Sequence, residues 1–388
     1  MTFQRDRTFW TIALQAAIVN FYLGGFGPAQ PLLREEQQTS LTIAGLHGTS
    51  LGIAAILAGF AGPRLVHLYG RARTSWIGIG IFSVGVTMFV FSPPIPLTLL
   101  ATLIGGFGTS TVINTMVTRI ASHYPQDSAR AVSQSVGFGS LGYIGGTLAV
   151  GTLAGTTLSW RLGLLVVPLF SIFLFLFNRK DNRAEHVLDE KGPQRGKLSK
   201  KFWIAWIGFV TCISSEFATT FWSAALLRER IGASAAISTV CIIAFGIGMA
   251  LGRIFGPRII SSLSLDNQIK FVISLQFVGF MTFWFSHILL LSLIALFATG
   301  AGLAMQFGLF SVRLISFSDG RPDLAVGQSS FAAGLAIAGA PFMLGLIGDH
   351  LGISKAYMMV PVLIAITLLT IFVVPSEDSK VSGQLNEL

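Results

Sequence analysis

The chain has 388 residues, of which 52% are hydrophobic and only 11% are charged, and its mean hydropathy is +0.72. Soluble globular proteins carry roughly 25% charged residues, so this composition excludes a water-soluble fold of such length. Apolar runs of about 20 residues recur along the chain, and each is long enough to cross roughly 30 Å of hydrocarbon. The composition therefore predicts an all-α membrane protein.

Twelve membrane-spanning helices are predicted in chain order. They cover residues 9–32, 42–66, 74–92, 95–118, 130–154, 159–178, 202–227, 235–260, 269–287, 289–312, 324–348 and 356–374. The first run lacks a small-residue cleavage site, so it is interpreted as a helix of the mature protein rather than a signal peptide. Cys212 and Cys241 lie inside apolar runs, which argues against a disulfide framework.

The distribution of positive charge predicts the orientation in the membrane. Of the 26 lysines and arginines, the side opposite the N-terminus holds only Arg34, Arg161, Arg228, Arg230 and Lys355. By the positive-inside rule, this asymmetry places both termini in the cytoplasm. We expect the protein to lie in the plasma (inner) membrane. The net charge of +9 then needs no nucleic-acid partner. The basic stretch before residue 202 is interpreted as a solvated loop that can touch anionic lipid headgroups.

The chain repeats itself with an offset of half its length. "LLRE" occurs at 32–35 and 226–229, "GPR" at 62–64 and 256–258, and "AVSQS" at 131–135 returns as "AVGQS" at 325–329. Each repeat holds six spans, and an even number makes the two repeats parallel in the membrane. We therefore predict an N-terminal bundle over 1–178, a cytoplasmic basic linker over 179–201, and a C-terminal bundle with a short tail over 202–388.

The loop "GPRLVHLYGRAR" at 62–73 resembles the cytoplasmic loop of the major facilitator superfamily, and the resemblance extends over essentially the whole chain. Gly70, Arg71 and Arg73 fit the pattern, whereas His67 stands where an aspartate is usual. The resemblance implies two parallel six-helix bundles, a substrate site at midplane, transport by alternating access, a monomeric protein and a latch formed by this loop.

A narrower resemblance, to the fucose-permease-like branch, rests on "EFATTFW" at 216–222 and the Gly-Arg pair that ends at Arg253. It implies sugars as substrates. Two features argue against drug–proton antiport. Leu141-Gly142 replaces the Gly-Pro of the antiporter motif, and Thr102 lies where those proteins have a membrane-embedded arginine.

Glu216 is the candidate proton-coupling residue. It lies about 21 Å along a helix from Phe202, somewhat beyond the middle of the membrane toward the outer side. A carboxylate at this depth is costly when it faces lipid, so we expect it to face protein or water and to bind a proton. The alternative is a neutral acid that bonds to a neighbouring helix. Arg253 is expected to reach the inner surface or a loop carbonyl rather than Glu216, and Trp222 to serve as packing or an outer anchor.

The resemblance implies that the first and fourth spans of each half line the cavity. The polar residues of these spans, together with two amides on the neighbouring fifth and eleventh spans, are the candidate substrate-binding residues: Gln15, Asn20, Tyr22, Gln30, Asn114, Gln134, Thr219, Thr220, Gln306 and Gln328. Tyr143, on the fifth span, is a further candidate. The candidate gating residues are the symmetric span ends and the loop motif: Arg34, Glu35, Arg228, Glu229, Gly70, Arg71 and Arg73.

These features predict a secondary transporter that moves a small organic solute and couples to protons through Glu216, with sodium as the alternative ion. Two other functions stay open: efflux of lipophilic cations or drugs, and a transporter-like sensor that binds without translocating. No nucleotide-binding loop or hydrolase motif occurs, so we predict no enzyme activity, no cofactor and no metal. Import or export is left undetermined.

Overall fold

The computed structural model describes residues 5–124, 128–178 and 196–376. The helices are α1 (Arg7–Phe26), α2 (Gln30–Gln37), α3 (Leu41–Phe91), α4 (Ile95–His123), α5 (Ser128–Ala154), the 3₁₀ helix η1 (Trp160–Leu165), α6 (Val166–Asn178), α7 (Lys200–Ile231), α8 (Ala235–Cys241), α9 (Ile243–Ile260), α10 (Leu265–Phe285), α11 (Leu289–Leu303), α12 (Gln306–Ser316), α13 (Pro322–Leu351), α14 (Ile353–Ala356) and α15 (Met359–Val373). Most of the predicted linker and the predicted tail lie outside the described residues.

Helix α3 contains two membrane crossings. Its 51 residues would extend roughly 76 Å at 1.5 Å per residue, about twice what one crossing needs. Gly70 interrupts it with φ 77° and ψ 162°, a conformation that glycine adopts without a Cβ clash. Eleven stretches of the described chain are long and apolar enough to span a membrane. Because α3 counts twice, the prediction of twelve spans is confirmed.

Three predicted spans are interrupted. The first ends at Phe26 rather than at residue 32, and the chain turns before α2 begins at Gln30. Pro28 and Pro31 lack the N–H groups that a continuous helix would use there. The eighth span is divided between α8 and α9, and the tenth breaks between Leu303 and Gln306. These breaks free backbone carbonyls inside the membrane.

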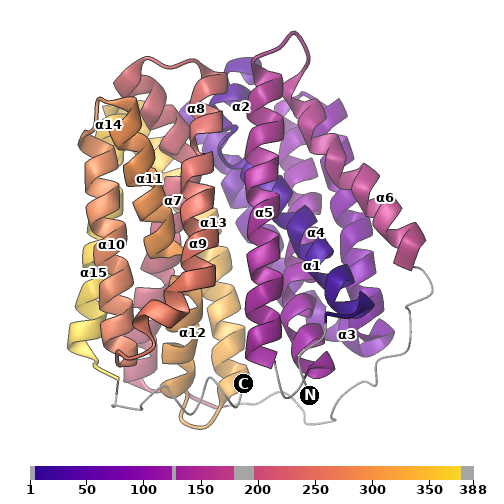
Figure 1. The fold of residues 1–388 in the computed structure, drawn as a ribbon, viewed down its shortest axis with the longest axis vertical. Helices are drawn as coiled ribbons and strands as arrows, with labels where there is room; N and C mark the ends of the chain where they lie inside the picture. The colour runs from indigo at the N-terminus through magenta and orange to yellow at the C-terminus, as the bar shows by residue number, and fades with distance from the viewer. Residues whose placement is uncertain (1–4, 125–127, 179–195, 377–388) are drawn as a thin grey trace.

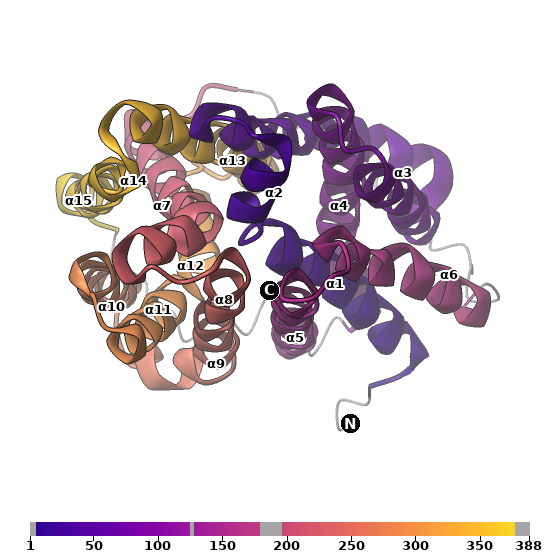
Figure 2. The same ribbon diagram turned by 90° about the horizontal axis from the view of Figure 1, so that it is seen from above.

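The helices form two groups that lie side by side. Helices α1–α6 make one group and α7–α15 the other, in both the side view and the view from above (Figures 1 and 2). Between them, α3 packs against α13 and α5 packs against α8 and α9. We call this boundary the seam. Following the charge prediction, the end with α2, α8 and α14 is called the outer end.

The seam is tightly closed in its outer half. A Cβ added to Gly52 of α3 would lie 2.2 Å from the backbone nitrogen of Ala338 in α13, and one added to Gly45 would lie 2.8 Å from the carbonyl oxygen of Pro341. Only glycine permits this approach of two backbones. Two turns further inward, a Cβ on Gly59 would have no neighbour within 4 Å. The small-residue contact between α3 and α13 is therefore confined to the outer side.

Candidate functional site

A polar cluster crosses the seam at mid-membrane. Arg253 of α9 donates from Nη1 to the hydroxyl oxygen of Ser140 in α5, at 2.9 Å. It also donates from Nε to the carbonyl oxygen of Ala304, at 3.3 Å. That carbonyl is available because it lies at the break between α11 and α12. One guanidinium thus binds both helix groups.

Arg253 was expected to extend to the inner surface or a loop carbonyl rather than to Glu216. Its carbonyl partner does lie outside a helix, in the break of the tenth span, and no hydrogen bond or ion pair joins it to Glu216 among the described residues, but the side chain does not extend to the inner surface. Side chains on a helix tilt toward the helix N-terminus. Helix α9 runs from the outer end to the inner end, so Arg253 reaches back toward the middle of the membrane. Glu216, on the oppositely directed α7, tilts inward and converges with it.

Glu216 lies midway between Lys200 and Ile231, the ends of α7. Its side chain is half-buried, and it accepts no hydrogen bond from the described residues. Its charge interacts with that of Arg253. Tyr143 of α5 also lies within its electrostatic reach, and the hydroxyl of this 9%-exposed tyrosine has no hydrogen-bond partner. The site therefore holds a carboxyl group, a cationic guanidinium and a tyrosine hydroxyl that has no hydrogen-bond partner among the described residues.

Two of the predicted substrate-binding amides are engaged within their own helix group. Gln306 is buried, accepts from Cys212 Sγ at 2.9 Å and donates to Gln276 Oε1 at 2.8 Å. Gln15 is buried and accepts from the Ser75 hydroxyl at 2.8 Å. Their carbonyl oxygens hold neighbouring helices together.

Other predicted residues bind carbonyl oxygens four residues earlier in the chain. Asn20, Gln30, Thr219 and Thr220 donate to the carbonyl oxygens of Ala16, Phe26, Ser215 and Glu216. Asn20 Nδ2 also lies 3.0 Å from where a Cβ on Gly139 of α5 would be.

The remaining candidates differ in exposure. Tyr22 is buried and stacks on Phe26. Gln134 accepts from Arg5 Nε at 2.9 Å. The exposed Asn114 and the half-buried Gln328 have side chains that bond to no other described residue. These two amides are the ones most available to a solute.

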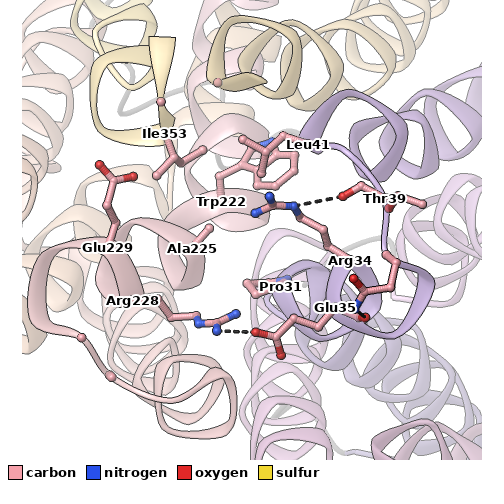
Figure 3. Close-up of a pocket in the computed structure, with 15 residues that line it drawn as sticks. Pro31, Arg34, Glu35, Thr39, Leu41, Trp222, Ala225, Arg228, Glu229 and Ile353 are labelled. Carbon is pink, nitrogen blue, oxygen red and sulfur yellow. Dashed lines mark hydrogen bonds and ion pairs between the residues drawn. The ribbon is translucent and has the colours of Figure 1, made fainter. Parts of the chain in front are cut away.

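The outer span ends meet around a cavity of about 800 Å³ (Figure 3). Arg228 forms an ion pair with Glu35 across the seam. Arg34 instead donates from Nε to the carbonyl oxygen of Thr39 at 3.2 Å, and Glu229 is exposed. Of the two symmetry-related pairs, Glu35–Arg228 and Arg34–Glu229, only the first therefore connects the two helix groups in this structure.

A second contact across the outer seam was not predicted from the sequence. Asp349 of α13 accepts hydrogen bonds from the backbone nitrogens of Leu41 and Thr42, at 2.7 and 2.8 Å, and from the Thr42 hydroxyl at 2.5 Å. A carboxylate at a helix N-terminus satisfies free N–H groups and complements the helix dipole. Asp349 thus caps α3 from the other helix group. The local signal at α3 is the N-cap Ser40, which gives no indication of a distant partner.

The predicted latch loop lies at the inner end. Gly70 supplies the turn of α3, Arg71 is half-buried, and Arg73 and His67 are exposed. Within the described chain, neither arginine makes a hydrogen bond. As far as the described residues show, neither arginine of this loop therefore holds the inner end through a hydrogen bond.

The family model of the Major Facilitator Superfamily matches residues 12–325. The chain belongs to this superfamily. It is 25% identical over 348 residues to YtbD of Bacillus subtilis, an uncharacterized MFS-type transporter, with 83% of this chain and 84% of YtbD covered. Membership makes the protein an integral membrane transporter of a small solute and not an enzyme.

Solved structures of the superfamily have the same fold. The nucleoside transporter NupG matches with a TM-score of 0.70 and 14% identity, over 95% of this chain and 98% of NupG. The xylose transporter XylE from E. coli, in a partially occluded inward open conformation, matches with a TM-score of 0.72 and 14% identity, over 96% and 99%. At this identity the likeness shows the major facilitator fold alone.

Proposed function

We propose that this protein is a secondary active transporter that moves a small organic solute by alternating access and couples it to protons through Glu216. The observation that carries the proposal is a mid-membrane carboxylate at the seam that accepts no hydrogen bond from the described residues. Such a group is costly in a membrane, and ionisable residues at this depth therefore mark functional sites such as proton relays. Because it faces groups from both halves, its protonation can change the energy of the seam.

The contacts at the outer end support alternating access. The Glu35–Arg228 pair, the cap of Asp349 on α3 and the glycine contacts of α3 all hold this end closed. Each is a discrete contact that can break as a unit. We propose that they form the outer gate, and that Arg34 and Glu229 change their partners when this gate opens. In that opposite state Gly70, Arg71 and Arg73 close the inner end.

Several finer features remain proposals. These are a plasma-membrane location with cytoplasmic termini, a monomeric state, a division into bundles 1–178 and 202–388, kinship to the fucose-permease-like branch, and substrate contacts by the predicted polar residues. Among them, Asn114 and Gln328 have side chains that bond to no other residue in the described part of the chain. Efflux of lipophilic cations is disfavoured, because Arg253 places a positive charge beside Glu216.

Reconstituted protein tests the proposed function. Proteoliposomes carrying wild type or Glu216→Gln are screened with sugars, carboxylates and lipophilic cations while the internal pH is recorded. Wild type should show solute-driven proton flux, and Glu216→Gln should lose it while retaining exchange of the same solute between the two sides. Asp319→Asn is the matched control, because Asp319 is an exposed acid at a left-handed turn that asparagine also adopts.

Two results would contradict the proposal. Proton flux that is unchanged in Glu216→Gln would make Glu216 a structural acid. Binding without flux or exchange in wild type would favour a sensor. Replacing the proton gradient by a sodium gradient distinguishes the two coupling ions.

A further inference from the structure

We infer that Arg253, Ser140 and Tyr143 form a subsite for the anionic group of the transported solute, and that the solute is a small organic monoanion such as a monocarboxylate. This inference rests on the proposed function and specifies its substrate class. It differs from the neutral sugars that the fucose-permease-like resemblance implies. It also gives a role to an arginine that the sequence analysis placed elsewhere.

The geometry provides donors from both sides of the seam. The guanidinium of Arg253 is held by Ala304 and Ser140 through Nε and Nη1, which leaves Nη2 without a described partner. Tyr143 is 9% exposed, and its hydroxyl has no partner either. Its ring packs against Gly246, one of the small residues that bring α9 close to α5. A carboxylate that reached these donors would satisfy polar groups that have no partner among the described residues.

The charge balance selects one negative charge. With Glu216 ionised, its charge offsets that of Arg253, and the site is neutral overall. With Glu216 protonated, Arg253 is an uncompensated cation inside the membrane, which is costly unless an anion joins it. A monoanion restores neutrality, whereas a dianion would leave a net negative charge.

This balance links anion binding to protonation. The titratable groups that face Glu216 are Arg253 from α9, Tyr143 from α5 and Cys212 from α7 itself. Protonating Glu216 removes the internal counterion of Arg253, so it strengthens anion binding, and by reciprocity a bound anion favours protonation. Proton and anion therefore occupy the site together, which makes the protein a proton–anion symporter.

Binding to the purified protein tests the subsite without requiring transport. Benzoate, nitrate and phosphate are the anionic probes, and benzamide is the neutral counterpart of benzoate. We expect wild type to bind benzoate in preference to benzamide and phosphate, and Arg253→Gln to lose roughly tenfold or more in benzoate affinity. Tyr143→Phe should lose less, and Arg253→Lys should retain part of the affinity. The control is Arg258→Gln, because Arg258 is an exposed arginine at the inner end of the same helix.

The pH dependence provides a readout that a merely structural arginine would not change. Wild-type affinity for benzoate should rise between about pH 8 and about pH 6, where benzoate itself stays ionised. Glu216→Gln mimics the protonated acid and should bind benzoate equally at both pH values. Absence of anion binding, equal binding by Arg253→Gln, or a pH slope unchanged in Glu216→Gln would each overturn the inference. If neutral solutes still drive Glu216-dependent proton flux, the proposed function stands while this inference fails; loss of both would reject both.

Discussion

Asp6 caps the N-terminus of α1 at the inner end of the molecule and binds several groups there. Its Oδ1 accepts from the backbone nitrogen of Phe9 at 2.9 Å and from the Tyr124 hydroxyl at 2.6 Å, and its Oδ2 lies 2.5 Å from Nε2 of His123. Burial raises the pKa of Asp6, but the bonds from Tyr124, Phe9 and His123 outweigh it and hold the pKa below the ordinary value of 3.8. Burial and the bond to Asp6 raise the pKa of Tyr124 to about 12.

These contacts predict an acid-sensitive contribution to stability. A depressed folded-state pKa means that ionised Asp6 stabilises the fold above its ordinary pKa, and that this contribution disappears as the pH falls through the lower folded-state value. Asp6→Ala should cost about 1 kcal/mol through loss of the helix cap, whereas Asp6→Asn should keep most of the cap. Thermal unfolding in detergent from neutral to acid pH measures both. A wild-type advantage over Asp6→Asn that persists at the most acid pH would contradict this assignment.

The candidate site could be predicted only in part at this scale. The apolar run around Glu216 predicts a buried carboxylate, and hydropathy suffices for that. The bond from Arg253 to the carbonyl of Ala304 was not predictable, because the reach of the side chain depends on the direction of α9 and on the break in the tenth span. The bond between Gln306 and Gln276 was not predictable either, because Gln276 belongs to no motif and approaches only in the packed bundle.

At the scale of helices, the contact between α3 and α13 depends on glycines, whose lack of a side chain lets the two backbones approach. A Cβ on Gly52 would lie 2.2 Å from Ala338 N and 2.4 Å from Gly334 O, so Gly52→Ala forces the two backbones apart. Gly59→Ala, two turns along the same helix, meets nothing within 4 Å and gains helix propensity of up to about 1 kcal/mol. We expect Gly52→Ala to lower the unfolding temperature and to increase labelling of cysteines introduced at the outer seam, and Gly59→Ala to do neither. Equal behaviour of the two variants would exclude a tight outer contact.

The twelve crossings were predictable because hydropathy is a local property of the chain. The break after Leu303 was not, since it depends on what the freed carbonyl binds. The carbonyl of Ala304 illustrates this, because its partner Arg253 comes from a different span. Gly70 was predicted from its motif, and the structure gives the physical reason, a positive φ that ends one crossing and starts the next.

For the whole molecule, the internal repeat predicts which span ends face each other, and Glu35 and Arg228 do pair across the seam. The repeat alone does not predict which end is closed, because two similar bundles can close at either end with nearly equal energy. Asp349 breaks this symmetry. Its counterpart at the same offset in the first half is Gly155, so only one half carries the carboxylate that caps a helix of the other.

Joining the two halves at this cap should stop transport. The Thr42 hydroxyl and the Asp349 carboxylate are 2.5 Å apart, so Thr42→Cys with Asp349→Cys places two thiols within reach of a short, reducible cross-linker. The native Cys212 and Cys241 are buried and provide little background reaction. Solute exchange by proteoliposomes should fall to the background rate on cross-linking and recover on reduction, because an outer end that cannot open admits no solute.

The matched control joins two outer residues of one half. Gln37 Nε2 donates to the carbonyl oxygen of Pro93 at 2.9 Å, within the first helix group, and Pro93 is exposed. Gln37→Cys with Pro93→Cys should therefore accept the same cross-linker and leave exchange running. If the pair across the seam also continued to transport when cross-linked, the outer ends would not separate during the cycle. The bundles would then have to admit solute by another route, and alternating access at this seam would be rejected.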